Sequence, residues 1–482
     1  SHLSPLECLQ KLEGRIVTFH FKDLNDFGPS AHDVPWGTGK ANVPELLAEI
    51  RRQNIKAVFS IEYEHNWDNS MPEIAQCVEF FEKVAKNIGT VKKTEALLGK
   101  IAVQSGKFDR QDTPVSLDLS QLPDPWRPLR LTEVKGDTRI PIPSQMDPSG
   151  QPVLWWILNG KTAADSVRTF ELYEGDPVAS MPVIVRQDEG WLEIVARGAR
   201  VLRYNNGYVV PPVGTDPRYI RSGYIHPAWS PTGLMVTEDF PADHLHHKGI
   251  WSAWTKTEFE GRHPDLWNLK GGTGTVRFAG FDWSASGAIF GGFAADMVHT
   301  DLSASPAKEA LNERWEVRVW NLGGPDDTFW LWDLTSVQKT AGDSPLLLPD
   351  YRYGGFGFRG SVEWVDEKLN LQTSEGKTRV DGHGTKSRWC DMSGPVGQGY
   401  AGVTILTHPS NFRFPQPMRI WDKGGTFFCY APPLDGDFAI EPGKDFVSRY
   451  RYLIHDGEAD RNTIERFWND FAEPPVVEAS FQ

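Results

Sequence analysis

Two patterns of hydrophobic and polar positions divide the chain. Within residues 1–90, short apolar runs alternate with segments whose apolar residues recur at helical spacing. The runs 15–21 and 57–63 are expected to be strands. The three helical segments each begin with a capping box: Ser4-Pro5-Leu6-Glu7, Asn42-Val43-Pro44-Glu45 and Ser70-Met71-Pro72-Glu73. Because strands that alternate with helices form parallel sheets, this order predicts a parallel pair of strands.

From about residue 100 onward, apolar and polar residues alternate with a period of two between turn residues. Trp315, Val317 and Val319, for example, are separated by charged residues. Further strand-like ranges are 275–281, 289–300, 329–337, 402–408, 426–430 and 448–454. Many short strands with turn signals predict a mainly β chain built around a large antiparallel β-sandwich.

A helix is expected close to the end of the chain. Asn462 is its predicted cap, and Glu465 completes the box before an apolar stripe that includes Phe467. The domain organisation that we predict is a partial (β/α) barrel segment at 1–90, a Pro-rich linker and lead-in at 91–130, and a β-sandwich domain at 131–482 that ends in this helix.

Polar residues follow the two predicted N-terminal strands: His20 and Lys22 the first, Glu62 the second. Here the stretches "GRIVTFHFKDL", "DVPWGTGKANVPELL" and "SIEYEHNW" resemble the sugar-phosphate isomerase/epimerase (xylose-isomerase-like) barrels over about residues 4–88. The resemblance implies that Glu62 helps to hold a divalent metal, while His20 and Lys22 face the sugar. A (β/α)₈ barrel takes about 250 residues, so this segment corresponds to the last quarter of a TIM barrel. We expect an upstream barrel segment, or a partner chain in a homo-oligomer, to complete residues 1–90.

Composition narrows the function classes. The net charge is −14, and no basic stripe is present, so a nucleic-acid partner is not expected. The longest apolar run, 153–158, is far from the roughly 20 residues that span a bilayer, so no membrane partner is expected. The chain as given starts in a polar segment without a signal peptide, and its four cysteines have no C-x-x-C spacing. We interpret the cysteines as buried thiols of a cytoplasmic protein.

The richest candidate chemistry lies in residues 224–268, which hold five of the 13 histidines. Three of these, His244, His246 and His247, fall within four residues. On an extended strand, His244 and His246 would face the same side, where they could ligate one divalent metal ion or act as acid and base. The alternative is a buried polar network that fixes a loop. The predicted catalytic residues here are His226, His244, His246 and His247, and the predicted sugar-binding residues are Tyr224, Trp254, Glu258 and His263.

A second candidate region is the charged, Gly-rich stretch 373–392. Dense charge in a loop next to tryptophans suits recognition of a hydroxyl-rich or anionic ligand, although a solvated hairpin tip would look the same. We predict His383 as a catalytic residue. The predicted binding residues of this stretch and its neighbours are Arg352, Lys377, Arg379, Arg388, His408 and Arg413.

The same motifs resemble the family known as PmoA-type methane oxygenases over roughly residues 100–475. The stretches that carry the resemblance include "DFPADHLHHKGIWSAWTKTEFEGRHPDLWN", "YRYGGFGFRG", "TSEGKTRVDGHGT" and "HPSNFRFPQPMR". The resemblance implies a β-sandwich similar to the galactose-mutarotase-like supersandwich, and carbohydrate-catabolic surroundings.

Three functions therefore compete. The first is a carbohydrate-active enzyme with lyase, hydrolase or epimerase chemistry at the histidine-rich site. The second is a non-catalytic sugar-binding module attached to an isomerase/epimerase barrel. The third is a metal-dependent oxygenase whose copper or iron is held by the histidines. In the first two, the expected partner is a carbohydrate ligand.

Overall fold

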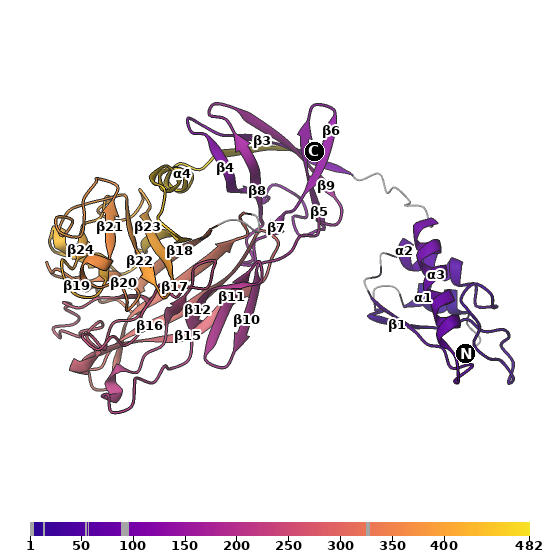
Figure 1. Cartoon of the computed structure of the whole chain (residues 1–482), viewed down its shortest axis with the longest axis horizontal. Coiled ribbons are helices and arrows are strands. Elements are labelled where there is room, and N and C mark those ends of the chain that lie inside the picture. Colours follow the sequence, from indigo (N-terminus) through magenta and orange to yellow (C-terminus); the bar gives the residue numbers. More distant parts are fainter. Residues whose placement is uncertain (1–3, 13–14, 54, 56, 88–95, 324–327) are drawn as a thin grey trace. The chain divides into compact units, whose positions relative to one another are not determined.

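The computed structural model describes residues 4–12, 15–53, 55, 57–87, 96–323 and 328–482. They fall into two compact units, Ser1–Glu95 and Ala96–Gln482 (Figure 1). Within the described residues, no helix is both long enough and apolar enough to cross a membrane.

The first unit has the predicted order of elements: α1 (Pro5–Lys11), β1 (Thr18–Phe21), α2 (Val43–Arg52), β2 (Val58–Ile61) and α3 (Met71–Asn87). Strands β1 and β2 pair in parallel, with Thr18 opposite Val58, so the predicted parallel pairing is confirmed. Helix α2 buries the apolar face that its spacing indicates, whereas Val78 of the stripe expected in α3 is exposed; the core of the unit includes Leu47, Ile50 and Cys77.

Two of the predicted capping boxes have different outcomes. The box at Ser4 is confirmed, because its side chain accepts from the Glu7 amide and the Glu7 carboxylate accepts from the Ser4 amide. The cap at Asn42 is not formed as predicted. Asn42 is left-handed, with φ 51°, and its side chain bonds no helix amide but contacts the carboxylate of Glu45.

The second unit is built on two antiparallel sheets of eight strands each. The first sheet has the order β10-β11-β12-β13-β14-β20-β25-β24. Its strands are β10 (Ile184–Asp188), β11 (Trp191–Ala196), β12 (Ala199–Asn205), β13 (Tyr224–Ala228), β14 (Ile250–Ala253), β20 (Gly355–Arg359), β25 (Phe427–Tyr430) and β24 (Met418–Ile420).

The second sheet has the order β15-β16-β17-β18-β27-β23-β22-β21. Its strands are β15 (Gly274–Ala285), β16 (Phe290–Asp301), β17 (Lys308–Trp320), β18 (Phe329–Thr340), β27 (Phe446–Asp456), β23 (Gly399–Thr407), β22 (Trp389–Val396) and β21 (Asn370–Thr373). A short pair, β19 (Leu346–Leu348) and β26 (Phe438–Ile440), lies outside both sheets. All of the strands predicted from residue 275 onward are therefore confirmed.

The inner faces of the two large sheets share one apolar core. Phe356 of the first sheet stacks on Trp315 of the second, with ring centroids 5.4 Å apart. Tyr430 likewise stacks on Tyr450 at 5.6 Å. Alternation along each strand therefore produces the predicted antiparallel β-sandwich.

A smaller pair of sheets precedes and follows the large sandwich in sequence. One has the order β28-β3-β9-β5-β6, and the other β4-β8-β7. Their strands are β28 (Val476–Phe481), β3 (Leu97–Gln104), β9 (Val167–Glu174), β5 (Leu129–Lys135), β6 (Thr138–Ile142), β4 (Arg110–Asp118), β8 (Val153–Thr162) and β7 (Gln145–Met146). They share a core of their own that includes Val103, Trp156 and Leu172. The range 91–130, which we expected to be a linker and lead-in, thus contains β3 and β4.

Helix α4 (Arg461–Ala472) packs on the outer face of the second large sheet. Its Ile464 and Phe467 lie in one core with Leu453 of β27 and Leu406 of β23. Two details of the prediction are wrong. The cap is Asp460, whose carboxylate accepts from the Thr463 amide, and the domain ends not in this helix but in β28, which returns to pair with β3.

Candidate functional site

The outer face of the first large sheet gathers most of the predicted site. Phe356 and Phe358 of β20 point into the sandwich core, so Gly357 and Arg359 point outward. Gly357 makes room there for two rings, because a Cβ at this position would lie 2.8 Å from atoms of both Trp251 and Trp267. A glycine in β20 therefore allows an aromatic layer to lie directly on the sheet. We call this surface, with the segment 237–249 that covers it, the histidine face.

The histidine run lies in consecutive turns, which corrects the extended strand that we expected. The amide of His244 donates to the carbonyl of Pro241 at 3.0 Å, and the amide of His247 donates to that of His244 at 2.8 Å. The turns place His244 and His247 parallel, with ring centroids 4.8 Å apart, while His246 meets both rings edge-on. All three imidazoles are therefore together, although not by strand alternation.

His247 is the innermost of the three and is 1% exposed. Its ring stacks on Phe427 at 4.8 Å and lies 5.2 Å from Trp251. Burial in this aromatic layer, followed by the charges of its neighbours, holds the pKa of His247 well below its usual range. Its Nδ1 is buried and has no hydrogen-bond partner among the described residues. His247 is thus a neutral ring that supports the other two.

His244 and His246 are closer to solvent. The His244 side chain is 39% exposed, and its ring lies 4.6 Å from that of Trp421. His246 is more enclosed, and burial, with a further contribution from His244, lowers its pKa to about 4. At neutral pH, His246 is therefore uncharged and can accept a proton or a hydrogen bond.

Arg359 connects two carboxylates beside these rings. Its Nε donates to Glu238 Oε2 at 3.0 Å, and its Nη2 donates to Asp243 Oδ1 at 2.8 Å. The other oxygen of Asp243, Oδ2, lies 3.3 Å from His244 Nδ1. Burial raises the pKa of Asp243, but Arg359 and His244 outweigh it and lower the pKa overall. Arg359, Asp243 and His244 therefore form a chain of short polar contacts, in which His244 Nδ1 lies at ion-pair distance from Asp243 without making a hydrogen bond.

A second polar group lies deeper, around Lys248. The Lys248 Nζ donates to Asp239 Oδ1 at 3.0 Å, and the Tyr224 hydroxyl donates to Asp239 Oδ2 at 2.6 Å. The side chain of Lys248 is fully buried, and burial lowers its pKa to about 8. Nearby, burial lowers the pKa of His226 to about 4, and its Nδ1 lies 3.0 Å from the hydroxyl of Thr237.

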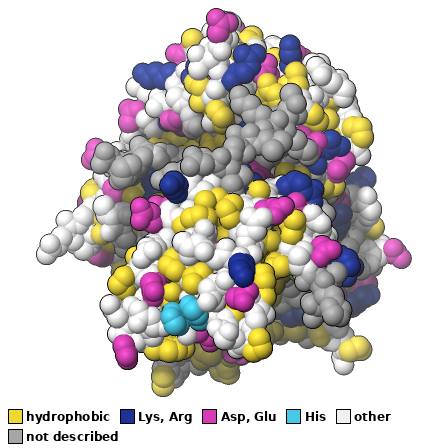
Figure 2. Space-filling model, turned by 90° about the vertical axis from the view of Figure 1, so that its right-hand side faces the viewer, with side chains coloured by type: hydrophobic (Ala, Val, Ile, Leu, Met, Phe, Trp, Pro, Cys, Tyr) yellow, Lys and Arg dark blue, Asp and Glu magenta, His cyan; other side chains and the backbone are white. Residues whose placement is uncertain are grey.

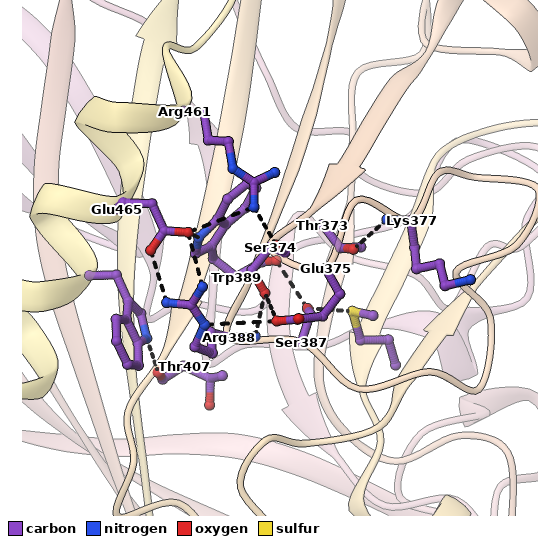
Figure 3. A network of polar contacts seen from close by, with 12 residues as sticks. Thr373, Ser374, Glu375, Lys377, Ser387, Arg388, Trp389, Thr407, Arg461 and Glu465 are labelled. Atoms are coloured by element: carbon purple, nitrogen blue, oxygen red, sulfur yellow. Dashed lines mark hydrogen bonds and ion pairs between the residues drawn. The ribbon is translucent and has the colours of Figure 1, made fainter.

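Several predicted binding residues contact the protein itself away from this face. Arg388 donates to both carboxylate oxygens of Glu465 in α4, at 2.8 and 3.0 Å, and stacks over Trp468 (Figure 3). Arg461 of the same helix donates to the Ser374 carbonyl. Lys377 pairs with Asp381 four residues on, in the same turn. The stretch 373–392 thus anchors α4 through Arg388, and its exposed end forms a local turn.

Most of the remaining predicted residues, His383 and Arg352 apart, also contact the protein itself. Arg379 donates to the carbonyls of Trp421, Asp366 and Gly424. Trp254 donates to Gln338 between the sheets, and the backbone of Glu258 pairs with that of Leu347. His263 Nδ1 lies beside the Thr257 carbonyl, and the His408 ring packs against Phe471 of α4. Arg413 donates to the carbonyls of Pro432 and Gly436.

Sequence reasoning missed Lys248, Asp239 and Trp421. Lys248 carried a usable signal, because it lies two residues before the apolar run of β14, where a buried charge needs a partner. Trp421 gave none, since it follows a three-residue strand far from the histidines in sequence.

The first unit also brings its predicted residues together. Glu62 lies 3.0 Å from Lys22 Nζ and 3.3 Å from His20 Nδ1, and Lys22 also pairs with Glu64. Hydrogen bonding to Lys22 lowers the pKa of Glu62. These residues lie at the ends of the paired strands β1 and β2, as their positions in sequence predict.

Metal binding by His244 and His246 stays a prediction. Their ring centroids are 5.6 Å apart. In the part of the chain that the structure describes, no group of three or more His, Cys, Asp or Glu side chains is arranged as a metal site.

Acidic and basic side chains are interspersed on the face drawn in Figure 2, so the net charge of −14 is not gathered into one patch there.

Comparison with known proteins places the large sandwich, including the histidine face, in one family. No curated protein matches the chain. Residues 192–469, more than half of the chain, match a family that is described as a family of unknown function (DUF6807). The chain therefore belongs to the DUF6807 family.

Proposed function

We propose that this protein is a carbohydrate-active enzyme that performs acid–base chemistry, as a lyase, hydrolase or epimerase, on a sugar or oligosaccharide at the histidine face. The observation that carries the proposal is the chain Arg359–Asp243–His244 beside the Trp421 ring. An imidazole oriented by a carboxylate is a common general acid or base. An indole face can stack on sugar C–H groups while polar groups bond the hydroxyls.

In this proposal, each residue has a distinct role. His244 exchanges a proton with the sugar through Nε2, because Asp243 faces Nδ1. His246, uncharged at neutral pH, accepts a hydrogen bond from a hydroxyl. Asp243 and Arg359 are positioning residues that act through His244.

The test is turnover of a panel of glycosides, oligosaccharides and oxidised sugars by the full chain, followed by NMR. His244→Asn should lower kcat/KM by about 10²–10⁴-fold. Asp243→Asn should cost less, because Asp243 acts only through its contact with His244. His32→Asn, which removes an exposed imidazole of the first unit, is the matched control. Wild-type turnover by His244→Asn would contradict the assignment.

A non-catalytic sugar-binding module is the second candidate, and the contact between Trp421 and His244 favours it as well. In that case His244→Asn would weaken sugar binding, while no member of the panel would be converted by the wild type.

We keep His244 and His246 as proposed ligands of one divalent metal ion. Metal analysis of the purified wild type and of the double variant His244→Asn/His246→Asn tests this directly. Copper or iron that is lost in the double variant, with a matching paramagnetic resonance signal, would favour the oxygenase instead.

Two finer fold relations are also proposals. The two eight-stranded sheets with a shared core support a galactose-mutarotase-like supersandwich and agree with the PmoA-type resemblance. The parallel pair β1–β2, with His20, Lys22 and Glu62 at its end, supports an origin of the first unit in an isomerase/epimerase barrel.

A further inference from the structure

Two arginines flank the ring of Tyr353 next to the histidine face. The guanidinium carbons of Arg352 and Arg419 lie 5.3 and 5.2 Å from the centre of this ring. The Tyr353 hydroxyl accepts from Arg419 Nη2 and from Trp421 Nε1, both at 3.3 Å. Since Trp421 also contacts His244 at 4.6 Å, this pair of arginines adjoins the proposed acid–base group.

Neither guanidinium has a carboxylate partner. Among the described residues, the contacts of Arg352 and Arg419 are with Tyr353 and with a backbone carbonyl, and neither arginine has an ion pair with an Asp or Glu. Arg419 Nη1 donates to the Ile420 carbonyl at 2.7 Å, but its Nε is buried and has no hydrogen-bond partner in the same part of the chain. The nearby acidic residue Asp422 is exposed, and its charge opposes the lowering of the His383 pKa by burial.

Other arginines of the second unit show what a structural role looks like here. Arg379 and Arg413 donate to two or more backbone carbonyls each, and Arg388 is paired with Glu465. Arg352 is exposed and stacks on Tyr353. Both guanidinium groups therefore place a positive charge beside the same ring, and an anion that contacts both would offset their mutual repulsion.

We propose that the sugar bound at the histidine face carries an anionic group, a carboxylate or a phosphate, that is held by Arg352 and Arg419. Guanidinium groups bind both anions with charge-assisted hydrogen bonds, which are about twice as strong as neutral ones. The inference rests on the proposed function for its site. It adds the class of substrate, an acidic or phosphorylated sugar, and the residues that select it.

The test is binding of matched sugars to the full-length chain, measured by calorimetry and saturation-transfer NMR. For glucose, galactose and mannose, the neutral sugar is compared with its uronate and its 6-phosphate. We expect at least one anionic form to bind at least tenfold more tightly than its neutral partner. Whether the uronate or the phosphate is preferred identifies the anion. Binding should weaken as salt is raised.

The double variant Arg352→Gln/Arg419→Gln should lower affinity for the anionic sugar by about tenfold or more, consistent with loss of charge-assisted hydrogen bonds. Lys423→Gln, which removes an exposed charge two residues beyond Trp421, is the matched control and should bind like the wild type. Circular dichroism and the thermal midpoint show that the variants are folded.

The outcomes separate this inference from the proposed function. Equal binding of neutral and anionic sugars, unchanged in the double variant, would overturn the inference and leave the enzyme proposal intact. Arginine-dependent binding of an anionic sugar without turnover would support the inference and contradict the enzyme proposal. If no sugar of the panel binds to the wild type, both fail.

Discussion

The outer faces of the two large sheets both carry arginines and histidines, but the two faces differ in the hydrogen-bond and ion-pair partners of these side chains. On the second sheet, α4 covers the face, and Arg451 there is paired with Asp333 at 2.6 Å. On the first sheet, segment 237–249 covers the face with imidazoles, and buried donors such as Arg359 Nη1 have no partner in the described chain. The second sheet also has a buried donor without a partner, Arg318 Nε, so the comparison teaches that neither residue type nor one such group marks a site, and that the first sheet differs by the partly exposed His244 beside Arg359.

Histidines make the contrast clearest. On the second sheet, His455 Nε2 lies 3.0 Å from Asp391 Oδ1, and Nδ1 lies 2.9 Å from the Gly457 carbonyl, so both nitrogens face oxygen acceptors. Burial lowers the pKa of His455, but Asp391 outweighs it and raises the pKa overall. On the first sheet, burial dominates and lowers the pKa of His226 and His246 to about 4. One face therefore holds an imidazole whose charged form is favoured, and the other holds imidazoles whose neutral form is favoured.

The largest expected effect lies where α4 meets the smaller pair of sheets. Arg110 Nη1 donates to Asp470 at 2.9 Å, and both side chains are 2% exposed. Asp470→Ala leaves the Arg110 charge buried without its partner, which should lower the free energy of unfolding by about 3–5 kcal/mol. Urea unfolding measures this. Glu309→Ala, in an exposed pair with Arg277, is the control, and an equal loss there would contradict the role of burial.

The next effect is a pH dependence that arises on the histidine face. His226 and His246 have a pKa of about 4 in the folded chain and about 6.5 when unfolded, so the unfolded chain binds more protons between these values. The free energy of unfolding should therefore fall as the pH falls from 6.5 to 4, by about 1.4 kcal/mol per pH unit for each histidine. His226→Gln should reduce this slope by one histidine's share in urea titrations. An unchanged slope would show that the pKa of His226 is not lowered in the folded protein.

On the second sheet the sign is reversed. The folded pKa of His455 is raised, so its stabilisation is complete below the unfolded pKa and is lost as the pH rises through the folded pKa. His455→Gln should cost about 1.5–3 kcal/mol at low pH, the range for a hydrogen bond to a charged group, and less at high pH. If the loss of unfolding free energy in His455→Gln instead grew as the pH rises, the opposite sign expected for the two faces would be wrong.

The smallest effect is expected at a residue that the sequence marked as a binding group. Lys377 pairs with Asp381 in an exposed turn. Lys377→Ala should change the free energy of unfolding by less than about 0.5 kcal/mol, because exposed pairs contribute little. Sugar binding should also be unchanged, and weaker binding by the variant would show that this turn is part of the binding site.

Much of the fold could be predicted because its signals are local. Alternation over Trp315, Val317 and Val319 indicated a strand in a half-buried sheet, and β17 follows it. The histidine region was located by its composition alone. The turn at His244–His247 was not predicted, because the sequence pattern there fits a strand as well as two turns.

The sequence by itself determined the strands, most helix positions and the segment in which the candidate site lies, since these depend on periodicity and short-range hydrogen bonds. Only the tertiary structure decided that Arg388 anchors α4, and that Arg359, Trp421 and Tyr353 join the histidines. Those contacts join residues from strands and loops far apart in sequence. Their partners are set by strand order and by which face each side chain occupies, and no local pattern encodes either.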